Sequence, residues 1–232
     1  VLLVDDADVD ASLTIMRSLL APHDVPFDPT VRFLNCRIGA LGFTWERHSE
    51  FMTYSFLAAG GGPLFDLAPF AQAALWIGAL PGRVIRSTQI ALIADAPDEA
   101  TIATHFAQDD LIISDVADGQ ARIWSDFRLH ADGFGRLLVQ DKGLQGAELA
   151  QLVQRLQELG NYRKIALLGL PEAQAATPLL TGLEQRLTAI TGRVAEPDAD
   201  ADAVLEALSA LAAALAQIVA RTRYRMSATQ AY

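Results

Sequence analysis

Residues 134–159, FGRLLVQDKGLQGAELAQLVQRLQEL, contain the change of hydrophobic pattern that decides the fold class. Up to Gln140 the apolar residues form short runs bounded by glycine and aspartate, which is typical of β-strands. After Gly143 leucines recur three and four positions apart, as on one face of a helix; they are Leu149, Leu152, Leu156 and Leu159. We therefore expect an α+β domain over residues 1–143 and a helical part over residues 144–232.

The part before Gly143 reads as strands with a few helices between them. A helix is expected at about 8–20, with Asp8 and Asp10 as candidate N-caps. Glycine, proline and Asp-Gly turns bound the strand-like runs, which are 1–4, 31–38, 41–48, 51–57, 84–94, 111–116, 121–130 and 134–140. Shorter helices are expected at 70–77 and 95–108. The arrangement predicts a mainly antiparallel sheet with packed helices.

The part after Gly143 carries three heptad-like apolar seams. They lie in residues 149–170, 180–194 and 203–228, and the acidic segment 196–202 joins the last two as an αα-hairpin. We expect a C-terminal bundle of three long helices that packs on the sheet as one globular unit. Its last helix turns basic at Arg221, Arg223 and Arg225 and would start a stalk, whose basic end suits an anionic surface.

Composition excludes several classes of protein. With 28 acidic and 18 basic residues the net charge is −10, which argues against a nucleic-acid partner. The single cysteine, Cys36, excludes a disulfide framework and a multi-thiolate metal site. No run of roughly 18 uninterrupted apolar residues is present, so we expect no membrane-spanning segment within the chain. Since the chain does not begin with Met, we expect it to be part of a longer protein.

Two short polar segments stand out as candidate sites, Trp45–Phe51 and Asp126–Phe134. Side chains two apart share one face of a strand. In the second segment the core would therefore receive Phe127, Leu129 and Ala131. The polar rows would hold eight candidate residues, which are Glu46, Arg47, His48, Glu50, Asp126, Arg128, His130 and Asp132. Because isolated rows of acid, base and imidazole are costly to bury, we predict that the two segments meet in space.

Three interpretations of this polar cluster stay open. The favoured one is a network of salt bridges between the segments, with Glu46 or Glu50 on Arg128 and Asp126 on Arg47. A second is a metal site made from imidazoles and carboxylates, but no metal-ligand spacing is present and two arginines would oppose a cation. A third is an acid/base enzyme in which His130 is tuned by its neighbouring carboxylates. No nucleophile motif or cofactor cradle accompanies it, so the sequence leaves enzyme activity open and unsupported, and we expect no cofactor and no metal.

The same segments resemble a known family. The chain is similar to the bacterial domain-of-unknown-function family 3422, described as uncharacterised membrane-anchored proteins, in Trp45–Phe51, Asp126–Phe134, Leu152–Leu156 with Tyr162-Arg163, and Arg223–Ala228. The resemblance runs from about residue 41 to the end of the chain. The chain departs from the family at Ser49, at Gly160-Asn161 and at Lys164-Ile165, which argues against a catalytic role for the helix that carries the last two pairs.

The resemblance implies a location and a set of roles. The chain would be the soluble domain of a membrane-anchored protein on the cytoplasmic side of the bacterial inner membrane, with membrane segments following in the longer protein. It would act in assembly, ligand sensing or ion handling, and the layout is also that of CorA-type metal-ion channels, by analogy only. We expect a homo-oligomer formed through the C-terminal helices. The alternative is an acid/base or metal-dependent enzyme that uses His48 and His130.

Overall fold

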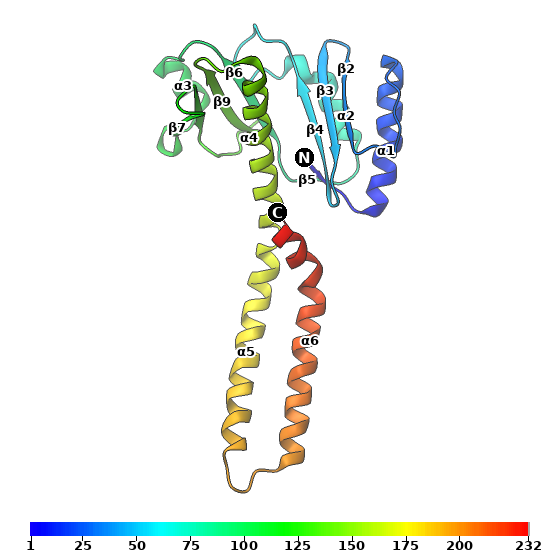
Figure 1. The fold of residues 1–232 in the computed structure, drawn as a ribbon, viewed down its shortest axis with the longest axis vertical. Helices are drawn as coiled ribbons and strands as arrows, with labels where there is room; N and C mark the ends of the chain where they lie inside the picture. The colour runs from blue at the N-terminus through cyan, green and yellow to red at the C-terminus, as the bar shows by residue number, and fades with distance from the viewer. Residues whose placement is uncertain (232) are drawn as a thin grey trace. The chain divides into compact units, whose positions relative to one another are not determined.

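The computed structural model describes residues 1–231 and shows an α+β fold (Figure 1). By internal contacts the chain divides into two compact units, Val1–Gln157 and Glu158–Tyr232. The division expected at residues 143 and 144 falls just before helix α4 (Gly146–Leu167), where the secondary structure changes from strands to helices. The expected packing of the helical part on the sheet stays a prediction.

The first unit contains a five-stranded antiparallel sheet in the order β2-β3-β4-β1-β5. Its strands are β1 (Leu2–Leu3), β2 (Phe33–Ile38), β3 (Leu41–Arg47), β4 (Phe51–Leu57) and β5 (Arg83–Val84). The expected antiparallel meander of three strands is confirmed, because β2, β3 and β4 pair in chain order. The first strand inserts between β4 and β5, which the sequence pattern did not reveal.

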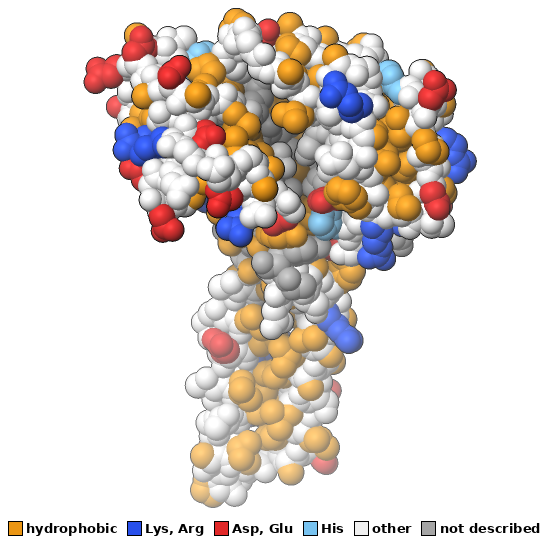
Figure 2. All heavy atoms as spheres, turned by 45° about the horizontal axis from the view of Figure 1, so that its top comes forward, with side chains coloured by type: hydrophobic (Ala, Val, Ile, Leu, Met, Phe, Trp, Pro, Cys, Tyr) orange, Lys and Arg blue, Asp and Glu red, His pale blue; other side chains and the backbone are white. Residues whose placement is uncertain are grey.

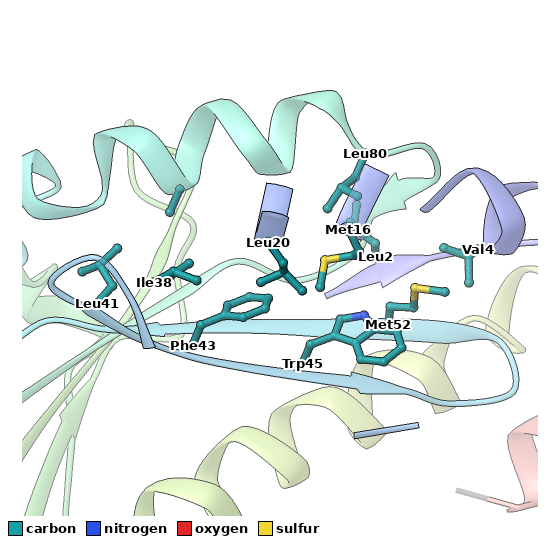
Figure 3. Close-up of a cluster of buried hydrophobic side chains, with 11 residues drawn as sticks. Leu2, Val4, Met16, Leu20, Ile38, Leu41, Phe43, Trp45, Met52 and Leu80 are labelled. Atoms are coloured by element: carbon teal, nitrogen blue, oxygen red, sulfur yellow. The ribbon is translucent and has the colours of Figure 1, made fainter. Parts of the chain in front are cut away.

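Helices α1 (Asp6–Leu20) and α2 (Ala71–Ala79) contribute to the larger hydrophobic core of this unit. Figure 3 shows Phe43, Trp45 and Met52 of the strands pointing toward the helical side chains, with Trp45 and Met52 fully buried. The N-cap of α1 is Asp5, whose carboxylate accepts a hydrogen bond from the Asp8 N–H, while the Asp8 carboxylate accepts one from the Asp5 N–H. Asp8 and Asp10 are therefore inside the helix, and their expected role as N-caps is wrong.

A second sheet of four strands follows, in the order β6-β9-β8-β7. Its strands are β6 (Thr88–Ile93), β7 (Ile112–Val116), β8 (Ala121–Ser125) and β9 (Gly135–Asp141), with α3 (Glu99–His105) after β6. Strands β6 and β9 are parallel and the other pairs are antiparallel, so this sheet is mixed. The single strand expected at 84–94 is divided between the two sheets. The smaller core holds Ile102, Phe106, Trp124 and Leu138.

The helical part contains three long helices, but they do not form the expected bundle of three. Helices α5 (Leu170–Val194) and α6 (Ala201–Ala231) pack against each other as a hairpin, whereas α4 begins in the first unit. Pro171 lies in the first turn of α5, where a proline is tolerated because its missing N–H would have no partner there. Short 3-10 helices, Ala21–His23, Ala68–Phe70 and Gln108–Asp110, complete the described elements.

Helix α6 is more apolar than its lack of a long uninterrupted apolar run suggested. Within residues 1–231 it is the one helix that by length and composition is long and apolar enough to cross a membrane, and none of its most apolar part is buried. The test of uninterrupted apolar residues failed here because Glu206, Ser209 and Gln217 interrupt a segment that is otherwise mostly alanine and leucine.

Candidate functional site

The second polar segment leaves β8 as a loop, because Asp126 ends the strand. Asp126 is 3% exposed, and its carboxylate accepts hydrogen bonds from the Arg128 N–H at 3.1 Å and from the Ala107 N–H at 2.9 Å. Satisfying these two backbone donors turns the chain away from the sheet. The strand expected over 121–130 therefore ends at Ser125, and the predicted alternation of Asp126, Arg128, His130 and Asp132 along one face is wrong.

Phe127 adopts a backbone conformation that is unusual for its residue type. Its φ is +53°, in the left-handed region that bulky residues avoid. The side chain is 65% exposed, and that of Leu129 is 74% exposed. Both were expected to face the core, and the structure corrects this: the turn that buries the Asp126 carboxylate points the apolar side chains of this loop toward solvent.

Asp126 and His130 form a pair at the base of this loop. His130 Nε2 lies 3.2 Å from Asp126 Oδ2 and 3.3 Å from Oδ1. Burial raises the pKa of Asp126, but the hydrogen bonds from Ala107, Arg128 and His130 outweigh it and hold the pKa below its ordinary value. Because an ionised carboxylate only accepts hydrogen bonds, Nε2 carries a proton and Nδ1 is left for another partner.

A hollow of about 280 Å³ lies over this pair. Its walls come from the end of α3 with the residues after it and from the loop after β8, and the lining residues are Thr104, His105, Phe106, Ala107, Asp126, Arg128, Leu129 and His130. Burial, together with the positive charges of Arg136 and His130, lowers the pKa of His105. The hollow therefore places a neutral imidazole and the Asp126–His130 pair on a surface open to solvent.

Two further ion pairs hold the loop in place. Arg128 pairs with Asp110, and Arg136 donates to Asp132 Oδ2 at 2.7 Å and to the His105 carbonyl oxygen at 3.2 Å. The Arg136 guanidinium also lies over the Phe65 ring, 5.3 Å from its centre. Arg136 and His105 were not among the site residues predicted from the sequence. A four-residue spacing brings side chains together on a helix, so the spacing of Asp132 and Arg136 across a turn and a strand was no signal, and nothing in the sequence placed His105 near His130.

The first polar segment forms the turn between β3 and β4. Glu46 and Arg47 lie in β3, and His48 follows it. His48 Nε2 is 3.6 Å from Glu46 Oε2, and its ring stacks on that of Phe51 at 4.1 Å. Glu50 is buried, and its carbonyl oxygen accepts a hydrogen bond from the Val4 N–H. This segment therefore fixes a hairpin in the five-stranded sheet.

The eight candidate residues thus belong to two separate structural settings. Asp126, Arg128 and His130 line one hollow, and Asp132 supports it through Arg136. Glu46, Arg47, His48 and Glu50 belong to the β3–β4 hairpin. In the part of the chain that the structure describes, Arg128 pairs with Asp110 and Asp126 with His130, in place of the cross-segment pairs that the sequence suggested.

The chemistry available at the hollow is hydrogen bonding and proton transfer. Among the described residues, no group of three or more His, Cys, Asp or Glu side chains is arranged to hold a metal ion. A buried carboxylate that orients an imidazole is the arrangement that a general base uses. The hydroxyl of Thr104, which also lines the hollow, donates a hydrogen bond to the Ala100 carbonyl oxygen at 2.8 Å, so the chemistry that the pair itself offers is proton transfer.

Comparison with known families assigns the chain to one of them. The model of the family described as protein of unknown function, DUF3422, matches residues 1–232. The chain belongs to the DUF3422 family. The match includes the first 40 residues, to which the resemblance in the polar segments did not extend. No curated protein and no solved structure matches this DUF3422 chain.

Proposed function

We propose that this DUF3422 chain is an assembly module of a membrane-anchored bacterial protein, on the cytoplasmic side of the inner membrane. Of the roles that the family resemblance implies, assembly is favoured over ligand sensing and ion handling by the geometry of the α5–α6 hairpin. The observation that carries the proposal is the apolar surface that this hairpin exposes. It includes Leu180, Leu187 and Val194 of α5 and Leu205, Leu208, Leu215 and Val219 of α6.

Exposed apolar surface of this kind is costly in water unless a partner covers it. Figure 2 shows hydrophobic side chains gathered along the hairpin. Soluble monomers rarely expose continuous apolar rows of this length, and such rows in helices usually mark packing against protein or lipid. The hairpin is therefore the element through which we expect the protein to associate.

The proposed location is supported by the charges at the end of α6. Arg221 and Arg223 are exposed and follow the most apolar part of the helix. Arginines beside an apolar helix favour the cytoplasmic side, where anionic lipids attract them. Flotation of the chain with vesicles of phosphatidylcholine and phosphatidylglycerol tests this: binding should fall with rising salt and should be weaker for R221Q/R223Q. Equal binding to neutral vesicles would count against the proposed location.

The assembly role is tested by the mass of the chain in solution. Light scattering over a range of concentrations should give a mass of at least twice the 25.0 kDa of one chain. A strict monomer at every concentration, in buffer and on vesicles, would refute it. Asp118 is exposed and lies in the first unit, away from the hairpin sequence. As a control, Asp118→Asn should therefore leave the measured mass unchanged.

The hollow over Asp126 and His130 supports a second candidate function, an acid/base enzyme or binding site. The observation in its favour is the burial of the Asp126 carboxylate against an imidazole that lines an open hollow. If this candidate is correct, His130→Gln should abolish binding or turnover of a ligand found by screening, while the fold is retained. The exposed residue Asp95 provides the control substitution Asp95→Asn.

A further inference from the structure

Helix α6 carries two apolar rows, of which α5 uses one. The row toward α5 is half-buried and consists of Val204, Ala207, Leu211, Ala214 and Ile218. The second row is exposed and consists of Leu205, Leu208, Ala212, Leu215 and Val219. Its members are three or four positions apart and so share one face of the helix. Its four large side chains are between 38% and 64% exposed.

Opposite charges lie at the two ends of this exposed row. Before it come Glu196, Asp198, Asp200 and Asp202, and after it come the exposed Arg221 and Arg223. Ala212 is the middle of the row, seven residues from both Leu205 and Val219. Asp202 precedes Ala212 by ten residues and Arg223 follows it by eleven, so each charge lies about 15 Å from the middle at 1.5 Å per residue.

We propose that a second copy of this chain docks on the exposed row of α6 in the antiparallel direction, with a twofold axis passing at Ala212. Leu205 then faces the partner's Val219, and Leu208 faces the partner's Leu215. The acidic end of each helix lies beside Arg223 of the other, which is on the side of the exposed row, three turns after Ala212. The small Ala212 at the axis allows the two helices to approach closely, as small residues do at helix crossings. This inference rests on the proposed assembly role and specifies its partner and direction.

Charge selects the antiparallel direction and the protein partner. In a parallel pair the two acidic ends would lie side by side and repel each other, because the exposed row between the charged ends holds only apolar side chains. A lipid surface would satisfy the arginines but would leave the acidic end beside anionic headgroups. In an antiparallel twofold pair both charged ends of the helix find opposite charges at once, since the basic end of each copy lies beside the acidic end of the other.

The first test uses two neighbouring alanines of α6 that are both exposed. The unsubstituted chain should have twice the 25.0 kDa mass by light scattering. Ala212→Glu places a charge at the axis and should weaken the dimer at least about 100-fold. Ala213→Glu adds the same charge one position away, off the exposed row, and should remain a dimer. A dimer that both variants form equally well would overturn the inference.

The second test determines direction by cross-linking in a Cys36→Ser background. Mixed Leu205→Cys and Val219→Cys chains should form a heterodimeric disulfide on mild oxidation, whereas neither alone should cross-link efficiently. Efficient cross-linking of Leu205→Cys with itself would indicate a parallel pair, which overturns this inference and leaves the assembly role intact. A chain that is monomeric in buffer and binds vesicles through the same row, so that Ala212→Glu abolishes flotation, would overturn it in favour of lipid.

Discussion

At the scale of single residues, Asp126 has the clearest physical role. Its carboxylate satisfies two backbone N–H groups and the His130 ring in a buried position. Asp126→Asn replaces one acceptor oxygen with a donor that faces another N–H, so we expect a loss of about 1–3 kcal/mol in unfolding free energy. Urea denaturation at pH 7 measures the loss, and an unchanged midpoint would contradict it.

The same carboxylate predicts a dependence on pH. Because the folded-state pKa of Asp126 is lowered, its ionised form stabilises the folded state above the unfolded pKa, which is about 3.9. That contribution is lost as the pH falls through the folded-state pKa. The difference in unfolding free energy between the unsubstituted chain and Asp126→Asn should therefore shrink as the pH falls below about 4. A difference that keeps growing below pH 4 would refute this.

Phe127 lies beside this carboxylate and stores backbone strain. A left-handed conformation costs a bulky residue about 1–2 kcal/mol, which glycine avoids. Since the side chain is mostly exposed, Phe127→Gly should leave the unfolding free energy unchanged or raise it by up to about 1 kcal/mol. Leu129→Gly, in the same loop and equally exposed, should lower it by about 0.5–1 kcal/mol. Equal losses for both would show that Phe127 makes a stabilising contact.

At the scale of elements, α1 begins after an N-cap at Asp5, and not at Asp8 or Asp10 as the sequence suggested. The capping box joins Asp5 and Asp8, whereas Asp10 lies one turn inside the helix. Asp5→Ala should cost about 1 kcal/mol by removing the N-cap, and Asp10→Ala should cost less than half of that. Chemical denaturation of the two variants side by side checks the assignment. The reverse order of losses would place the helix start at the later acids.

At the scale of the whole molecule, the division into two compact units predicts that each contributes separately to stability. Trp45 is fully buried in the larger core of the first unit. Trp45→Ala should lower the protection of β3 and β4 amides by about 3–5 kcal/mol in hydrogen exchange. Amides of α5 and α6 should keep their protection, because they lie in the other unit. Equal losses in both units would show that the chain unfolds as one cooperative body.

Much of this architecture followed from local pattern alone. The α+β class, the β2–β3–β4 meander and the αα-hairpin at the acidic segment depend on alternation, heptad spacing and turn residues, which neighbouring residues determine by themselves. The family assignment likewise came from short polar segments and is confirmed by the match over the whole chain. Local pattern failed at 84–94 because a continuous apolar run does not reveal that its two ends belong to different sheets.

What the tertiary structure decided is which distant groups meet. Nothing near Asp126 in the sequence indicates that it accepts the Ala107 N–H, yet this bond and the one from Arg128 end the strand and expose Phe127 and Leu129. The alternation rule therefore gave the wrong face. Likewise, periodicity predicted a single apolar seam on the last helix, whereas α6 carries a half-buried row toward α5 and a second, exposed row. A helix face is buried or exposed according to its neighbours in space, and those neighbours are set by packing rather than by the local sequence.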